Sequence, residues 1–304
     1  MKGLRKGAHP DDCEFKCSGL ATKLKIGVFI NLSENICDDI RRMHSLGFDN
    51  CQLNSLPPFG EYSGECFTDE MAEKINAVCE ELKFTITAVF AGWSGYHNFG
   101  YPEMYKTLGF VPGYLRDRRM KDVLAGADFA AKLNVKNVFT HIGYLRDDPH
   151  DEQREAIVVT LRYIADHLKK NGQALQIETG EMLPVSLVQL FVEIGRDNVG
   201  VNFDPANFLI NGRANPSDAL DLLLPYVKGV HAKDAVYPIG TNPKGHQCPI
   251  GEGQVDFDYI IRTLLKSGYD GCLTIEREIT GDQQIKDIVK AAEYLRVMIE
   301  KIEI

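Results

Sequence analysis

Four side chains with the chemistry of metal ligands recur in the second half of the chain: Glu178, Asp204, His231 and Glu276. Each lies within, or at the end of, a short apolar segment that predicts a β-strand. Three carboxylates and one imidazole favour Mn²⁺, Co²⁺ or Mg²⁺ over structural Zn²⁺, which prefers thiolates and histidines. Burying the carboxylates together without a cation would be strongly unfavourable, because like charges repel in a low-dielectric cleft. The four residues therefore predict a buried site for one divalent cation.

The alternation of side chains along the same segments supports this interpretation. The residue before each of the four is apolar: Ile177, Phe203, Val230 and Ile275. Side chains in a strand point alternately to its two faces, so the apolar residues would face a helix layer and the polar ones a common interior. A single acid is more often exposed to solvent than bound to a metal. The shared pattern of all four is what indicates a site.

The segments that carry these residues are the last four of eight predicted strands. The strands are predicted at residues 25–30, 49–54, 84–91, 136–142, 173–179, 198–204, 228–233 and 271–278. Amphipathic patterns typical of helices lie between them, at residues 35–47, 69–83, 119–134, 153–172 and 256–268 among others. Strict alternation with a repeat of about 35 residues predicts parallel strands and an α/β fold.

Eight such units predict one closed (β/α)8 TIM barrel over residues 24–304. An open, doubly wound sheet is the alternative, but no glycine-rich turn follows the first strand, which ends at Ile30. Residues 1–23 are polar and include Pro10, so we expect them to form a short N-terminal extension.

Two long connections should lie on the functional face of such a barrel. Residues 92–115 and 235–255 follow the third and seventh predicted strands, and barrel active sites form at the carboxyl ends of strands. The first connection is rich in aromatic residues, including Trp93, which could stack on a sugar; packing on the barrel or on a second subunit is the alternative. Glu252, in the second connection, is expected to order its loop.

Two further polar residues share the predicted interior face. His141 could donate a hydrogen bond to a substrate hydroxyl, or be a core histidine whose polar atoms are satisfied by the protein. Lys233 lies two residues after His231 and could stabilise an oxyanion; pairing with Glu278 or Asp234 is the structural alternative.

Composition excludes several classes of function. The net charge of −9 and the lack of a dense Lys/Arg cluster argue against a nucleic-acid partner. No run of apolar residues is long enough for a membrane span or a signal peptide, and the eight cysteines are scattered. We therefore expect a cytoplasmic protein with reduced thiols and no membrane partner.

The strand ends resemble those of a known group of barrels. The segments QIETG, NFDPAN, GVHAKD and TIERE, with PIGEGQVDF before the last, resemble the xylose isomerase-like barrels over residues 24–300. Within that superfamily they are similar to the sugar phosphate isomerase/epimerase group, which includes the ketose 3-epimerases. The resemblance implies one divalent ion on the four residues, Mn²⁺ first. It also implies that Glu178 and Glu276 form a proton-transfer pair and that Glu252 lies near the metal.

Three departures from the ketose 3-epimerases concern the substrate. Asn207 occupies the position of a substrate-contacting histidine, and Glu181 follows Glu178 by three residues, where the family has a glutamate six residues on. An arginine that usually follows the seventh-strand histidine is also missing. We expect Glu181 and Asn207 to contact the substrate, together with His141, Lys233, Glu252 and Trp93, but not to select a free ketohexose.

The sequence thus predicts a metal-dependent isomerase or epimerase of a small carbohydrate. Metal-chelated carbonyl and hydroxyl oxygens would make the adjacent C–H acidic enough for a carboxylate to remove its proton, through an enediolate. A lyase acting on a keto-inositol or a 3-keto glycoside is the main alternative, because an enolate can also expel a leaving group. An endonuclease IV-like phosphodiesterase and a non-catalytic subunit are further alternatives, and homo-oligomerisation is left open.

Overall fold

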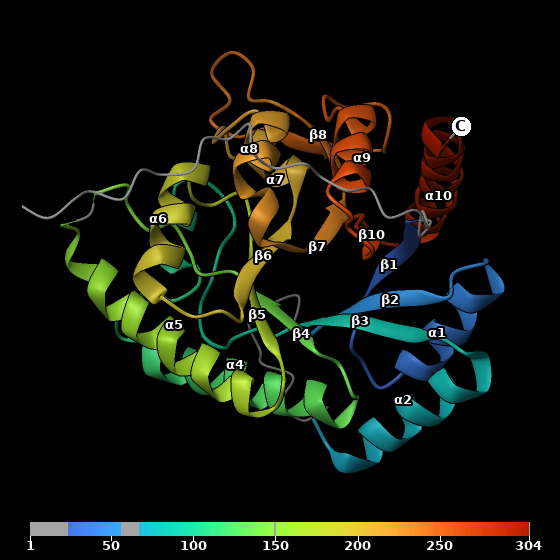
Figure 1. Cartoon of the computed structure of the whole chain (residues 1–304), viewed down its shortest axis with the longest axis horizontal. Coiled ribbons are helices and arrows are strands. Elements are labelled where there is room, and N and C mark those ends of the chain that lie inside the picture. The colour runs from blue at the N-terminus through green and yellow to red at the C-terminus, as the bar shows by residue number, and fades with distance from the viewer. Residues whose placement is uncertain (1–23, 56–66, 149, 304) are drawn as a thin grey trace, which may run out of the picture.

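Eight parallel strands close into a barrel in the computed structural model, which describes residues 24–55, 67–148 and 150–303 (Figure 1). The order around the barrel is β1-β10-β7-β6-β5-β4-β3-β2. The predicted (β/α)8 barrel is therefore confirmed over the open sheet, while the N-terminal extension lies outside the described residues. The barrel strands are β1 (Lys25–Asn31), β2 (Asn50–Asn54), β3 (Thr85–Phe90), β4 (Asn137–Thr140), β5 (Ala174–Glu178), β6 (Val199–Phe203), β7 (Val227–Ala232) and β10 (Cys272–Ile275).

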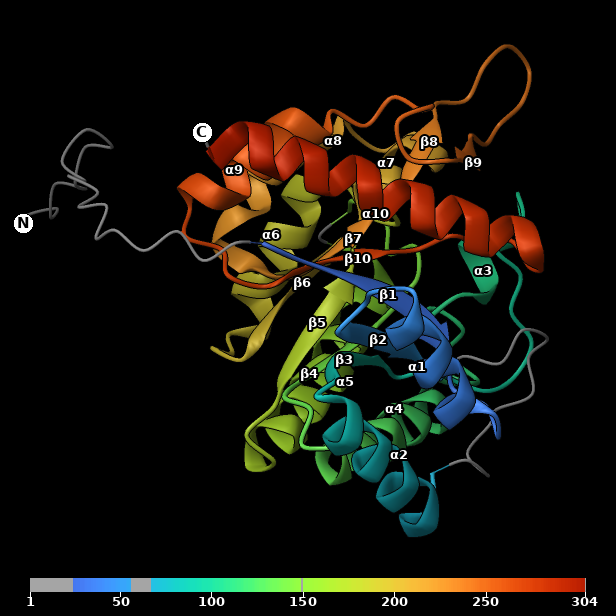
Figure 2. The same ribbon diagram turned by 90° about the vertical axis from the view of Figure 1, so that its right-hand side faces the viewer.

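Helices cover the outside of the barrel, and the long α10 lies across β1 and β10 (Figure 2). They are α1 (Ile36–Ser45), α2 (Asp69–Leu82), α3 (Met104–Thr107), α4 (Arg116–Lys132), α5 (Glu152–Lys170), α6 (Pro184–Ile194), α7 (Pro205–Ile210), α8 (Pro216–Leu223), the 3₁₀ helix η3 (Leu224–Tyr226), α9 (Phe257–Lys266) and α10 (Asp282–Glu303). None of the helices in the described ranges is at once long and apolar enough to span a bilayer.

Local sequence signals set the ends of several helices. The Thr68 side chain accepts a hydrogen bond from the Met71 amide at the start of α2, which satisfies a donor that the helix itself leaves unpaired. Helix α6 begins at Pro184, a residue preorganised for a first turn. It ends at Ile194 and is followed by the capping residue Gly195, whose φ of 60° is readily adopted by glycine.

The apolar residues separate into an outer and an inner cluster. Ile177, Phe203, Val230 and Ile275 belong to the large cluster between the strands and the helices, as the alternation along the strands predicts. A small cluster of Ala88, Phe90 and Phe139, with Phe29 against it, lies apart from the large one. Because these residues have the opposite parity, they fill the barrel interior beside the predicted metal ligands.

A small hairpin forms in the second long connection, where no strands were predicted. β8 (Asp234–Val236) and β9 (His246–Cys248) pair antiparallel and lie against α7. The buried Asp234 carboxylate accepts four backbone N–H bonds, from Ala235, Gly251, Gly253 and Val255. Asp234 therefore orders the loop that Glu252 was expected to order.

Arg119 holds the aromatic connection after β3. Its fully buried guanidinium donates to the backbone carbonyls of Ser94, Tyr96, Thr107 and Gly109 at 2.6 to 3.0 Å. Its Cζ also lies 4.3 Å from the centre of the Trp93 ring. One side chain from α4 thus fixes several turns of a connection that has little regular structure of its own.

Replacing Arg119 by methionine should lower the free energy of unfolding by ~3 kcal/mol or more, because four carbonyls lose their buried donor. Arg118→Met, at the exposed neighbouring position, is the control and should change it by no more than ~0.5 kcal/mol. Urea denaturation followed by circular dichroism measures both. Equal stability of the two variants would contradict the role of Arg119.

Candidate metal centre

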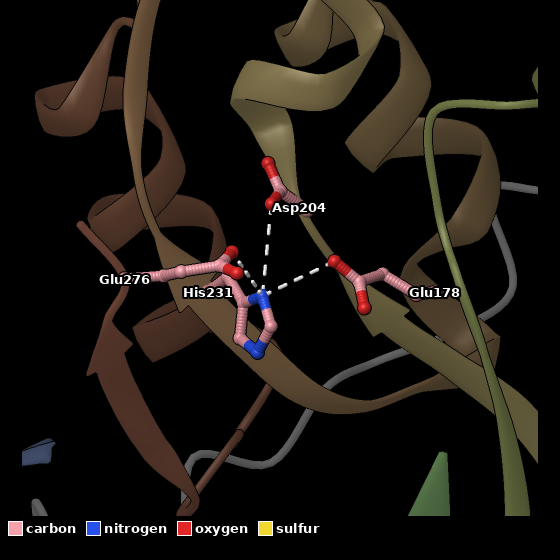
Figure 3. A group of neighbouring side chains, drawn as sticks. All are labelled: Glu178, Asp204, His231 and Glu276. Carbon is pink, nitrogen blue, oxygen red and sulfur yellow. Dashed lines mark ion pairs between the residues drawn. The ribbon is translucent and has the colours of Figure 1, made fainter. Parts of the chain in front are cut away.

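The four predicted ligands converge at the carboxyl ends of consecutive strands (Figure 3). Glu178 ends β5, Asp204 follows β6, His231 lies in β7 and Glu276 follows β10. One donor atom from each residue lies within 4.8 Å of all the others. His231 Nδ1 is 3.0 Å from Glu276 Oε2, 3.4 Å from Glu178 Oε1 and 3.6 Å from Asp204 Oδ2. All four side chains are buried.

Two of these atoms are buried without a hydrogen-bond partner among the described residues. They are Asp204 Oδ2 and His231 Nδ1. Buried polar atoms are normally paired, so two orphans that face one point indicate that something else satisfies them. The other oxygen of Asp204 accepts the Asn207 amide at 2.9 Å and so caps α7. A short helix thus orients the carboxylate and leaves Oδ2 facing the other ligands.

The charge around this point matches a divalent cation. Lys233 Nζ lies 3.0 Å from Glu276 Oε2 and 3.5 Å from Asp204 Oδ2. With His231 neutral, as a metal ligand must be, three buried carboxylates and this buried ammonium leave two negative charges unbalanced. Lys233 also pairs with the more exposed Glu278 at 2.9 Å, one of the two pairings expected from the sequence. A carboxylate and imidazole group of this kind can bind a metal ion.

Electrostatics within the group already draw positive charge toward His231. Burial alone would lower the pKa of His231, but the carboxylates of Glu276 and Glu178 outweigh it and raise the pKa well above its usual value. Burial would raise the pKa of Glu276, but Lys233 and His231 outweigh it and hold the pKa far below the usual range. The pKa of Glu178 is lowered too, since His141 and His231 outweigh burial. The glutamates are thus ionised at neutral pH.

A second buried pair adjoins the ligand group. His141 Nε2 lies 3.5 Å from Glu178 Oε2, and His141 Nδ1 lies 3.3 Å from Glu181 Oε1. Burial raises the pKa of Glu181, while its other oxygen accepts the Gly143 amide at 2.7 Å. Burial would lower the pKa of His141, but Glu178 and Glu181 outweigh it and raise the pKa. His141 thus connects Glu181 to a predicted metal ligand.

A small cavity of about 90 Å³ opens beside this pair. The polar residues that line it include His141, Glu181, Asn207, Asn211, Lys244 and Glu278. Asn207 also donates to Glu178 Oε1 at 3.2 Å and accepts from Lys233 at 3.2 Å. Both long connections reach the cavity, because Phe99 lines it and the Lys244 ammonium donates to the Phe99 carbonyl at 2.7 Å.

Two of the predicted site residues do not join this group. The indole of Trp93 is fully buried and donates to the His141 carbonyl at 3.2 Å. The Glu252 carboxylate is half exposed and pairs with Lys290 in α10 at 3.0 Å. Trp93 therefore has the environment of the packing alternative, and its indole N–H reaches the backbone of His141, but Trp93 is not among the described residues that line the cavity. Glu252 is turned outward because Asp234 holds the loop from inside.

Two polar residues near the centre were not predicted from the sequence. Gln52 Oε1 lies 2.8 Å from His231 Nε2, and Lys244 reaches the cavity from the hairpin loop. The only indication of Gln52 in the sequence was that an amide side chain lies in the second strand at a position that faces the barrel interior. No motif marked Lys244.

Residues 40–298 match the family described as xylose isomerase-like TIM barrel. Two curated relatives match shorter stretches. The uncharacterized protein MJ1311 of Methanocaldococcus jannaschii is 30% identical over 120 residues, 38% of this chain and 37% of that protein. The uncharacterized protein YihM of Escherichia coli is 31% identical over 112 residues, 36% of this chain and 34% of that protein. The chain thus spans little more than a third of the length of the curated relatives that it matches.

Solved structures match over nearly the whole chain. A xylose isomerase domain protein from Planctomyces limnophilus is 28% identical with a TM-score of 0.82, over 92% of this chain and 98% of that chain. The 3-keto-D-glucoside 4-epimerase YcjR from E. coli is 19% identical with a TM-score of 0.66, over 90% of this chain and 100% of that chain. A xylose isomerase-like TIM barrel protein from Mycobacterium smegmatis, in complex with magnesium, is 19% identical with a TM-score of 0.67. The match covers 91% of this chain and 98% of that chain.

A neighbour with a different type of activity also shares the fold. The probable 3-DHS dehydratase AsbF from Bacillus anthracis is 16% identical with a TM-score of 0.62, over 89% of this chain and 99% of that chain. The barrel fold is therefore shared with an epimerase and a probable dehydratase among the structural neighbours.

The purified chain equilibrated with Mn²⁺ should contain about one ion per chain by elemental analysis after desalting. Asp204→Asn should bind Mn²⁺ at least ~10-fold more weakly by titration calorimetry, because it removes one anionic ligand while keeping the Oδ1 acceptor that caps α7. Asp258→Asn, an exposed residue paired with Arg262 on α9, is the matched control and should retain wild-type affinity. Equal affinities in all three proteins would exclude Asp204 as a ligand.

Proposed function

Because the chain belongs to the family of xylose isomerase-like TIM barrels, we propose that it is a divalent-metal-dependent isomerase or epimerase of a sugar or sugar derivative. One observation carries the proposal: four donor atoms at the ends of four neighbouring strands meet within 4.8 Å, and two of them are buried without a hydrogen-bond partner in the part of the chain that the structure describes. A purely structural network would satisfy these atoms with hydrogen bonds, and it would not concentrate three carboxylates around one imidazole.

Glu178, Asp204, His231 and Glu276 would hold the ion, with Mn²⁺ as the first candidate and Co²⁺, Mg²⁺ or Zn²⁺ as alternatives. When bound there, a divalent cation would polarise a substrate carbonyl and make the neighbouring C–H more acidic. The magnesium complex of one structural neighbour is consistent with an oxygen-rich site for a hard cation.

Glu178 and Glu276 are proposed to move the substrate proton. They approach His231 Nδ1 from opposite sides (Figure 3), so a substrate carbon between them would present one face to each. Their lowered pKa values keep both ionised at neutral pH, as a general base requires. One carboxylate would remove a proton, and return from the opposite side would invert the carbon. Return to the adjacent carbon would isomerise the sugar.

The remaining polar residues are proposed to orient the substrate. His141 and Glu181 face the cavity as a pair. Asn207 also lines the cavity, and Lys233 donates to its side-chain oxygen. Lys233 presents a buried positive charge that can stabilise an oxyanion on the substrate. We assign Trp93 the indirect role of holding the His141 backbone. We assign Glu252 no contact with substrate, because its carboxylate pairs with Lys290.

Replacing Glu276 by glutamine should reduce turnover by at least ~10²-fold, because the amide cannot accept the proton. The fold should persist, since Lys233 keeps Glu278 as a partner. Glu73→Gln, at an exposed position of α2, is the matched control and should retain full activity. The assay supplies ketoses, 3-keto glycosides and inososes in D₂O with Mn²⁺, and reads products by NMR and mass spectrometry.

An isomerase or epimerase should incorporate deuterium at the carbon next to the substrate carbonyl. A product that lacks water or an aglycone would instead identify a lyase, the competing outcome of the same proton removal. Full turnover by the Glu276→Gln variant would exclude the proton-transfer role of Glu276.

A further inference from the structure

The barrel interior beneath the candidate metal centre is polar, although barrel interiors are usually filled by branched apolar residues. Gln52, Gln176, Asn202 and Thr274 are each almost completely buried there. Gln52 Nε2 donates to Asn202 Oδ1 at 3.3 Å, and Gln52 Oε1 lies 2.8 Å from His231 Nε2. A column of amides thus runs from the middle of the barrel up to one of the four proposed ligands.

The backbone is shaped around this column. A methyl group on Gly229 would lie 2.4 Å from Asn202 Oδ1 and 2.8 Å from Gln176 Oε1, so only glycine leaves room for both amides. The strand register also shifts at two places, between Cys51 and Gln52 and between Val201 and Asn202. Such irregularities redirect side chains and are frequent beside active sites. The two register shifts therefore fall at Gln52 and Asn202, the two amides that are joined by a hydrogen bond.

The bond between Gln52 and His231 fixes the orientation of the imidazole. Because the Gln52 amide nitrogen donates to Asn202, its oxygen faces His231 and must accept a hydrogen bond from the Nε2–H group. In the neutral form that a metal ligand must adopt, the ring then carries its lone pair on Nδ1, the atom that faces the three carboxylates. Phe29 and Phe139 contact the same ring, with centroids 5.2 and 5.4 Å away, and limit its rotation.

We infer that Gln52 is a positioning residue that selects the His231 tautomer able to bind a metal ion through Nδ1. This inference rests on the proposed function, because it gives Gln52 a role only if His231 is a metal ligand. Partners of this kind behind a metal-bound histidine typically contribute 10-fold to 100-fold to metal affinity.

The test compares three substitutions in the full-length chain by titration calorimetry with Mn²⁺. Gln52→Leu removes the acceptor and should raise the Kd by ~10-fold to 100-fold. Gln52→Glu keeps an oxygen opposite Nε2 and should stay within ~3-fold of wild type or bind more tightly. Gln176→Leu makes the same change elsewhere in the barrel interior and, as the matched control, should also stay within ~3-fold.

A Gln52→Leu variant that binds Mn²⁺ as tightly as wild type would overturn the inference and leave the proposed function intact. A wild-type chain that binds no Mn²⁺ would contradict the proposed function itself. If Gln52→Leu fails to fold, long-range ¹H–¹⁵N NMR spectra of the Mg²⁺-loaded wild type show which ring nitrogen of His231 carries the proton. The signals of His231 are assigned by their loss from the spectrum of the His231→Asn variant. The inference requires a proton on Nε2 of His231, and a proton on Nδ1 would overturn it.

Discussion

Repulsion among three buried carboxylates is the constraint on which the candidate site depends. The three carboxylates lie together at one end of the barrel, where little water is left to screen the charges of Glu178, Asp204 and Glu276. Lys233 balances part of this charge, but two of the ligand atoms have no hydrogen-bond partner among the described residues. The geometry is therefore organised for a further cation, and a divalent ion would balance the remaining negative charge.

The fold meets this constraint with rigid elements. Each ligand comes from a separate strand or from the residue after it, and neighbouring strands hold one another through parallel hydrogen bonding. The flanking groups are also fixed by backbone contacts: Asp204 caps α7, Glu181 accepts the Gly143 amide, and Trp93 holds the His141 carbonyl. Sites built on such elements keep their geometry better than sites built on loops alone.

Much of this arrangement could be predicted because two simple periodicities govern it. Strand parity placed Ile177 outward and Glu178 inward without any knowledge of tertiary contacts, and the repeat length indicated the barrel. The exceptions depend on contacts between distant segments. Trp93 is buried by Arg119, which follows it by 26 residues. Glu252 faces away because Asp234 accepts the amides on both sides of it. Gln52 meets His231 across the barrel, a proximity that no local pattern encodes.

The central claim is that one ion is bound jointly by the four residues, and anomalous diffraction from crystals grown with Mn²⁺ tests it most directly. We expect a single strong anomalous peak at ~2.2 Å from one donor atom each of Glu178, Asp204, His231 and Glu276, with the histidine bound through Nδ1. Four side chains turned away from one another, with no peak between them, would contradict it.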